Sequence, residues 1–196
     1  MKMTVTLLLA LTSLAAAQTA GLYDPAPPAN SAFVRVLNAP TATVGDKVVT
    51  ADKGAASTYV VIPQGDVTAK VGGVSSKLKV EAGKFYSVVS SGTTLTLLTD
   101  QAADNKAKAL LTIYNLSKSG SIDLKTADGK TAVVGGVKPG TSGSRAVNGI
   151  TVDLAAFDGA KALGTLKSVK LERGSAYALV VTDTGMTVTT SSTKTK

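Results

Sequence analysis

Few side chains in this sequence could act as acids, bases or nucleophiles. The 196 residues contain no histidine and no cysteine, so the commonest general base and the thiolate nucleophile are both missing. A Ser-His-Asp triad cannot form without histidine. The only two glutamates are Glu81 and Glu172, and a pair of carboxylates can share acid–base work. Each precedes a glycine at the equivalent position of a repeat, so we expect turn or surface roles for both and no catalytic residue.

Two D-L-x-x-x-D-G motifs contain aspartates that could bind a metal ion. They run from Asp123 to Gly129 and from Asp153 to Gly159. A calcium site needs several oxygen ligands that converge in one loop, whereas Asp-Gly between two strand-like segments is typical of a tight hairpin turn. We therefore predict turns at both places, with neither a metal ion nor any other cofactor.

One segment of the chain occurs twice. Residues 78–97, LKVEAGKFYSVVSSGTTLTL, match residues 169–188, VKLERGSAYALVVTDTGMTV, at a constant offset of 91. Each copy reads as an apolar strand, an E-x-G turn, a second strand around a tyrosine and a third strand, which predicts a β-meander. Two copies of a meander predict two related β-domains in tandem.

The first strand of each predicted domain can be aligned in the same way. Residues 32–37, AFVRVL, match residues 110–115, LLTIYN, at an offset of 77. Because side chains of a strand alternate between its faces, the valines of the first copy face one side and Arg35 faces the other, where Thr112 is its counterpart.

These patterns predict an all-β protein made of two related β-sandwich domains in tandem. The first domain is expected at 32–100 and the second at 109–190, and the polar segment 101–108 is too short for a stable helix and is expected to link them. A single short strand is predicted over 44–50.

The N-terminus has the composition of a secretory signal peptide. Lys2 precedes an apolar run, and small residues precede an expected cleavage site after Ala17. The apolar run is too short for a stable membrane span. We expect a protein that is exported without spanning the membrane, to the periplasm of a cell with an outer membrane and otherwise to the surface or medium.

The segments at the two ends of the mature chain are expected to lie outside the sandwiches. Residues 18–31 contain several prolines and predict an extended lead-in. Its large apolar residues, Leu22 and Tyr23, could bind a partner or could fold back and cap the first sandwich. Residues 191–196, SSTKTK, predict a disordered tail.

The chain has a formal net charge of +8, from lysines spread along its length. Such a surface attracts polyanions weakly and in a salt-dependent way. The export signal argues against nucleic acid, so anionic polysaccharide or an acidic protein is the expected partner class. A basic surface without any specific ligand is an equally good interpretation.

Several motifs together carry a family resemblance. They are LYDP at 22–25, SAFVRVLN at 31–38, PQGD at 63–66, KALLTIYNLS at 108–117, LKTADGK at 124–130 and LERG at 171–174. In their order and spacing they resemble the AlgF family, the accessory proteins of alginate O-acetylation, over essentially the whole mature chain.

The resemblance implies a non-enzymatic periplasmic accessory protein for the O-acetylation of alginate or a similar acidic exopolysaccharide. In such systems separate enzymes with a Ser-His-Asp site transfer the acetyl group, and the accessory protein would bridge these acetyl-handling periplasmic proteins. The residues of the family-like signature that we select as candidates for partner contact are Leu22, Tyr23, Pro25, Pro28 and Arg35.

Two other functions remain open at this point. The first is a secreted surface or matrix β-sandwich protein that binds anionic glycan through scattered lysines, because the first domain also resembles a broader class of extracellular β-sandwich repeats. The second is an acyltransferase in its own right, which the missing histidine disfavours.

Overall fold

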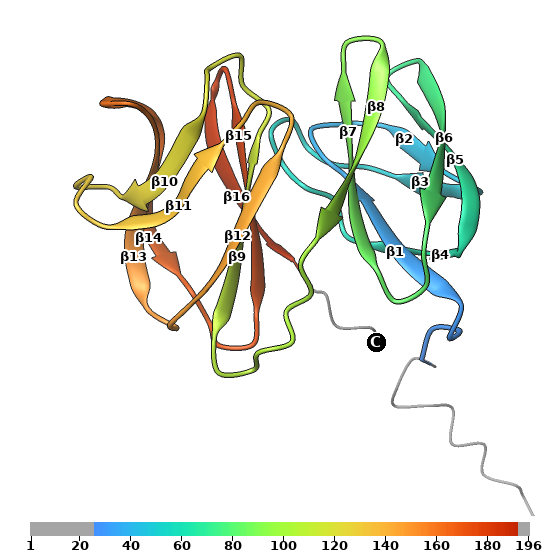
Figure 1. Ribbon diagram of the computed structural model, residues 1–196, viewed down its shortest axis with the longest axis horizontal. Helices are drawn as coiled ribbons and strands as arrows, with labels where there is room; N and C mark the ends of the chain where they lie inside the picture. Colours follow the sequence, from blue (N-terminus) through green and yellow to red (C-terminus); the bar gives the residue numbers. More distant parts are fainter. Residues whose placement is uncertain (1–25, 192–196) are drawn as a thin grey trace, which may run out of the picture.

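The computed structural model describes residues 26–191. The predicted signal peptide, three of the candidate contact residues (Leu22, Tyr23 and Pro25) and the last five residues of the predicted tail lie outside this range. Within it the chain forms strands, turns and loops, which confirms the all-β prediction (Figure 1). Residues 26–191 include no apolar helix of a length that would span a bilayer.

The first eight strands form an N-terminal unit. They are β1 (Ser31–Val36), β2 (Ala42–Val44), β3 (Lys47–Val49), β4 (Val60–Pro63), β5 (Gly65–Val71), β6 (Val74–Val80), β7 (Phe85–Ser91) and β8 (Thr94–Asp100). They make two four-stranded sheets in the orders β4-β1-β7-β8 and β3-β2-β5-β6. Alternating burial in β5 places every second residue in the core between the sheets.

The other eight strands form a C-terminal unit of the same design. They are β9 (Ala109–Asn115), β10 (Ile122–Thr126), β11 (Ala132–Val137), β12 (Ser142–Val147), β13 (Thr151–Asp158), β14 (Lys161–Lys170), β15 (Ala176–Thr182) and β16 (Gly185–Ser191). Their sheets have the orders β12-β9-β15-β16 and β11-β10-β13-β14, so each strand occupies the place of the strand eight positions earlier. The two units are therefore related β-sandwiches, as the repeat predicts.

The strand register confirms both sequence offsets. In the N-terminal unit β1 pairs in parallel with β7, and Val34 lies opposite Tyr86. In the C-terminal unit β9 pairs in parallel with β15, and Leu111 lies opposite Tyr177. The offset of 77 relates β1 to β9, and the offset of 91 relates β7 to β15. Both offsets therefore lead to the same pairing of residues in the two units.

Two details of the sequence interpretation are wrong. The single strand predicted over 44–50 is a hairpin of β2 and β3 that turns at Gly45, whose φ of 61° favours glycine. The predicted meander is not one sheet either. β6 pairs with β5, whereas β7 pairs with β1 and β8, so the E-x-G turn carries the chain from one sheet to the other. An alternating pattern reveals strands but not their partners.

A tyrosine hydroxyl stabilises this crossing turn in both units, which explains the spacing of the repeated motif. The backbone nitrogen of Glu81 donates to Tyr86 OH at 3.3 Å, and that of Glu172 donates to Tyr177 OH at 2.8 Å. The glycine between each pair is in the left-handed region, with φ near 72° and 75°. The glutamates therefore mark turns, and the tyrosines close them in the manner of a tyrosine corner.

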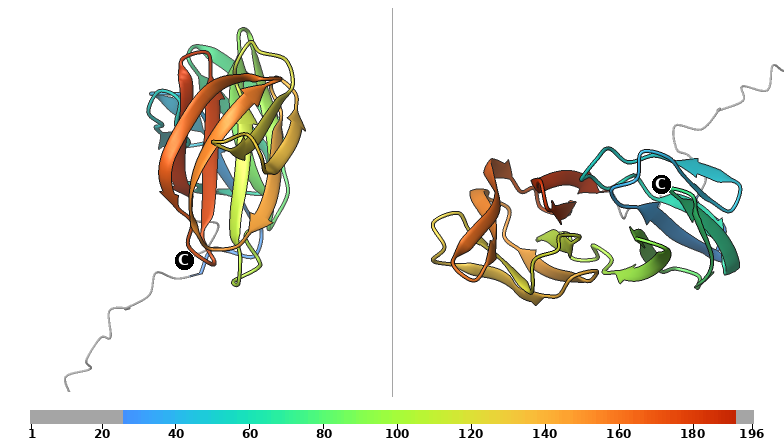
Figure 2. Two further views of the ribbon diagram at one scale, coloured as in Figure 1. Left: turned by 90° about the vertical axis from the view of Figure 1, so that its left-hand side faces the viewer. Right: turned by 90° about the horizontal axis from the view of Figure 1, so that it is seen from above.

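The two units lie side by side and contact each other through one sheet each (Figures 1 and 2). Sheet β4-β1-β7-β8 of the N-terminal unit faces sheet β12-β9-β15-β16 of the C-terminal unit, and β1 and β9 are buried along their whole length. Both faces of these strands are covered, one by the core of its own unit and the other by the neighbouring unit. Residues 101–108, which the sequence assigns to a linker, contain no strand.

Candidate functional site

An apolar cluster joins the two units. Leu37 and Val89 of the N-terminal unit pack with Tyr114, Ala178 and Val180 of the C-terminal unit, and all five are nearly or fully buried. Backbone and threonine hydroxyl groups of the two units also form hydrogen bonds with each other beside this cluster. The hydrophobic contact area therefore continues from one sandwich into the next.

Arg35 lies at the centre of a buried polar cluster in the same interface. Its Nε donates to Oγ of Ser87, a residue of the same N-terminal unit, at 2.8 Å. Its two terminal nitrogens reach the C-terminal unit, where Nη1 donates to Ser191 Oγ at 2.6 Å and Nη2 to Tyr114 OH at 2.5 Å. Asp100, at the end of β8, lies 3.5 Å from Nη2 and accepts from Ser87 at 2.5 Å and from the Tyr114 hydroxyl. One ion pair and its hydrogen bonds thus connect both units.

Burial and neighbouring charges shift the pKa values of the arginine and the two tyrosines of this cluster. Burial raises the pKa of Tyr114 and of Tyr59, so both hydroxyls stay protonated and donate to Asp100. Desolvation opposes the charge of Arg35, but Tyr114, Tyr59 and Asp100 outweigh it and the pKa of the guanidinium is raised. Arg35 also lies 4.5 Å from the centre of the Tyr59 ring, within cation–π distance.

The cluster has the properties of a structural link. Throughout residues 26–191, no buried side-chain nitrogen or oxygen lacks a hydrogen-bond partner. The serine, the carboxylate and the tyrosines of the cluster are engaged with one another, and Arg35 and Asp100 are 2% and 7% exposed. A substrate would have to separate the two units to reach them.

The structure separates the two described residues of the predicted contact site. Pro28 is exposed just before β1, and its carbonyl oxygen accepts from the backbone nitrogen of Ser31 at 3.0 Å. Arg35 is buried between the units and has no surface with which to contact a partner in this arrangement. The reason is that β1 is covered on both faces, so the side opposite the core is an interface and not a solvent-exposed face. Leu22, Tyr23 and Pro25 lie outside the described residues.

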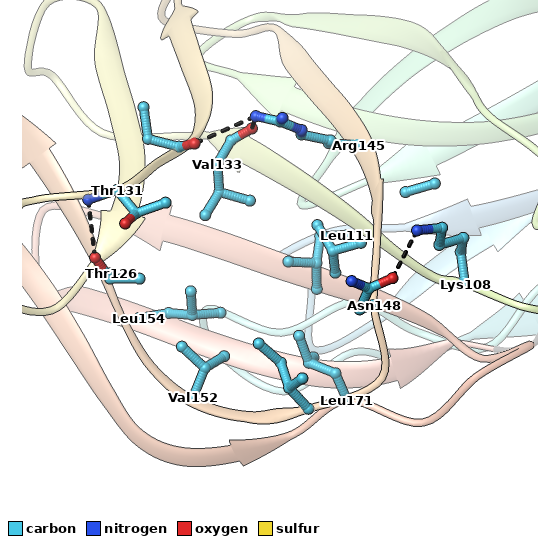
Figure 3. A pocket seen from close by; sticks show the side chains of 14 residues that line it. Lys108, Leu111, Thr126, Thr131, Val133, Arg145, Asn148, Val152, Leu154 and Leu171 are labelled. Atoms are coloured by element: carbon cyan, nitrogen blue, oxygen red, sulfur yellow. Dashed lines mark hydrogen bonds between the residues drawn. The ribbon is translucent and has the colours of Figure 1, made fainter.

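The C-terminal unit contains a pocket of about 330 Å³ where the edges of its two sheets separate (Figure 3). The edge strands β11 and β12 are in close contact at Gly143, where an added Cβ would lie 2.7 Å from a methyl group of Val134. The pocket lies toward the other end of β12, around Val147 and Asn148. Its floor consists of core leucines, and Ile150 at its border is 52% exposed.

Two cations line this pocket, and no acidic residue does. Arg145 Nη1 donates to the backbone oxygens of Ala132 and Val133 at 3.2 and 3.0 Å, which ties β12 to β11. Lys108 Nζ donates to Asn148 Oδ1 at 2.6 Å, as Figure 3 shows. The result is an aliphatic cavity with a positively charged border.

Sequence analysis missed both the interface and the pocket. The interface could have been recognised, because FYSVV in β7 and AYALVV in β15 are nearly continuous apolar runs, which are typical of strands buried on both faces. The pocket depends on how far two edge strands separate, and no local pattern in the sequence encodes that distance.

Comparison with known proteins identifies relatives that match most of the chain. The family model described as alginate O-acetyl transferase AlgF matches residues 6–178. The alginate biosynthesis protein AlgF of Pseudomonas putida is 41% identical over 172 residues, which cover 85% of this chain and 80% of that protein. The protein of the same name from Pseudomonas aeruginosa is 39% identical over 177 residues, covering 87% of this chain and 82% of the relative.

A further relative and a solved structure are also similar to this chain. AlgF of Azotobacter vinelandii is 36% identical over 179 residues, covering 88% of this chain and 82% of that protein. A solved structure of the C-terminal domain of AlgF from Pseudomonas aeruginosa is 41% identical and covers 43% of this chain and 97% of its own, with a TM-score of 0.36.

Proposed function

Because this chain belongs to the AlgF family of alginate biosynthesis, we propose that it is a non-enzymatic periplasmic accessory protein for the O-acetylation of alginate or a similar acidic exopolysaccharide. It bridges separate proteins that carry or transfer the acetyl group. The observation that carries this proposal is the family match over most of the chain, since the alginate pathway is the feature that the named relatives share.

Two observations support a role without catalysis. The sequence contains no histidine and no cysteine that could act as base or nucleophile. The connected group of polar side chains around Arg35 and Asp100 is buried and internally paired. These groups hold two sandwiches together and leave no polar centre of the interface open to an acetyl donor.

The fixed contact between the units supports a bridging role. A protein that brings two partners together benefits from a scaffold that fixes their separation, because a rigid scaffold reduces the entropy lost on assembly. In this proposal Leu22, Tyr23, Pro25 and Pro28 contact a partner at the start of the N-terminal unit. Arg35 acts indirectly by holding the C-terminal unit in place.

A second candidate function has one structural observation in its favour. Lys70, Lys77 and Lys79 are exposed on the outer face of β5 and β6, where Asp66 is paired with Lys79 in the strand register. A basic sheet face of this kind attracts anionic polysaccharide. If binding of oligouronate is strong at low salt and is lost when these lysines are replaced by glutamine, a glycan-binding surface protein becomes the better description.

Deletion of the gene tests the proposed function. We expect the exported polysaccharide to lose its acetyl groups while its yield stays the same, and the wild-type gene supplied in trans to restore them. The purified protein should release no acetate and transfer no acetyl group from an activated ester. Unchanged acetylation in the deletion strain would refute the accessory role, and turnover by the purified protein would refute the non-enzymatic one.

A further inference from the structure

We propose that the pocket between β11 and β12 is a docking socket for a large apolar side chain on an acidic segment of a partner protein. The inference rests on the proposed bridging function and adds to it the surface and the chemistry of one of the two contacts.

The lining of the pocket determines the kind of group that fits. Leu111, Leu154 and Leu171 form an aliphatic floor that is continuous with the core, and each is at most 4% exposed. The volume of about 330 Å³ falls at the lower end of the range for specific ligand sites and suits one or two side chains. Water in such an aliphatic cavity finds few polar partners, so an apolar side chain that displaces it is favoured.

The border of the pocket determines the charge of the occupant. Lys108 and Arg145 are the charged residues that line it, and each is held by a hydrogen bond that directs it toward the border. A segment with aspartate or glutamate next to its apolar residue would place its carboxylates near these two cations. A basic segment would be repelled at the same place.

Two other occupants fit the same surface less well. An added β-strand would need free backbone groups along β11, but the carbonyl oxygens of Ala132 and Val133 already accept from Arg145, and Asp123 accepts from the backbone nitrogen of Gly136. A sugar ring would need an aromatic surface or several free polar groups, whereas the lining has no aromatic residue and is mainly aliphatic. A protruding protein side chain meets neither obstacle.

The chain offers matched controls for a direct test. Ile150 at the pocket is 52% exposed, and Val48 on β3, the strand equivalent to β11 in the other unit, is 69% exposed. Lys108 lines the pocket, whereas Lys106 is exposed two residues earlier and does not line it. Ile150, Val48 and Lys106 are exposed and Lys108 is half-buried, so substitutions at these sites should leave the fold intact, which thermal unfolding of each variant checks.

The experiment places a photo-reactive amino acid at position 150 or 48 of the full-length protein in alginate-producing cells. Cross-linked peptides are identified by mass spectrometry after irradiation. We expect position 150 to cross-link to a protein segment that has an aliphatic or aromatic residue beside aspartate or glutamate, and position 48 to miss that segment. Lys108→Glu in the same background should lower the yield of this cross-link about tenfold, and Lys106→Glu should leave it unchanged.

Acetylation of the polymer gives an independent readout. Ile150→Asp should lower the acetyl content at least twofold, because it places a negative charge at the border of the pocket, where the acidic segment binds. Val48→Asp should leave the acetyl content unchanged. Cross-linking of position 150 to polysaccharide alone, to basic segments, or to no macromolecule would overturn the proposal, as would normal acetylation with Ile150→Asp. If the deletion strain loses acetylation and Ile150→Asp does not, the docking socket is refuted and the accessory function stands.

Discussion

The buried ion pair between Arg35 and Asp100 leads to a quantitative prediction about the contact between the units. In Arg35→Met, Asp100 stays buried without a cation, and the three hydrogen bonds from the guanidinium are lost. Removal of one partner of a buried ion pair costs about 3–5 kcal/mol, because the other charge stays out of water. In Asp100→Leu the guanidinium is the uncompensated charge, and a cost of similar size is expected.

The double variant separates this effect from a simple loss of contacts. With both substitutions, no unpaired charge remains between the sheets, and two apolar side chains fill the space. Replacing a whole buried ion pair by apolar residues is often close to neutral. We therefore expect the double variant to be no less stable than either single variant, with a coupling energy of at least about 2 kcal/mol.

Equilibrium unfolding in urea provides the measurement. Circular dichroism would follow the strands, and tyrosine fluorescence is a second probe in a chain that has 5 tyrosines and no tryptophan. Coincident transitions would show that the units unfold together. Additive effects of the two substitutions, or a cost below about 1 kcal/mol for Arg35→Met, would show that the cluster does not hold the units as we describe.

Three further predictions concern single residues. The free energy of unfolding should fall as the pH rises above about 10, because the raised pKa of Tyr114 keeps its hydroxyl neutral in the folded state while the tyrosine of the unfolded state ionises near 10.0. Tyr114→Phe should make the free energy of unfolding, measured in urea at pH 9 to 11, depend less steeply on pH. Gly164→Ala should destabilise the C-terminal unit by about 1–3 kcal/mol in thermal unfolding, because the added Cβ would lie 2.5 Å from a backbone nitrogen of β16. Gly120→Ala is the control and should be nearly neutral, because its Cβ would have no atom within 4 Å. Tyr177→Phe should cost about 1 kcal/mol in the same assay, since it removes the hydroxyl that accepts from the turn of the repeat, and an unchanged melting temperature would contradict that role.

The sequence predicts the fold well because the fold is periodic and repeated. Apolar segments and glycine turns locate the first strand and the last three strands of each unit, and two constant offsets relate the units. The pairing of strands is harder to predict. β6 and β7 are adjacent in the chain and joined by a tight turn, yet they belong to different sheets. The turn residues that allow this, Gly83 with its φ of 72° and the hydroxyl of Tyr86, are also compatible with a hairpin until the rest of the core is known.

The position of Arg35 was harder still to predict. Alternation correctly places it on the face opposite the valines of β1, and an arginine on such a face is ordinarily in water. Its burial depends on Tyr114 and Ser191, which are 79 and 156 residues away in the sequence. Long-range partners of this kind leave no local pattern, and its place in the family-like signature is the feature of the sequence that selects Arg35 as a candidate for partner contact.

The Arg35 and Asp100 variants can distinguish a direct role of Arg35 in partner binding from the internal one that its burial supports. If Arg35 contacts a partner, every variant without the guanidinium should lose acetylation, whatever its stability. If Arg35 holds the two units together, Arg35→Met should lower acetylation because the units lose their fixed placement, and the added Asp100→Leu should restore acetylation together with stability. The measurement is the acetyl content of the polymer at equal protein level in strains that carry each variant. Recovery of the acetyl content in the double variant would establish the internal role. Continued loss of acetylation in a stable double variant would show that Arg35 contacts a partner directly.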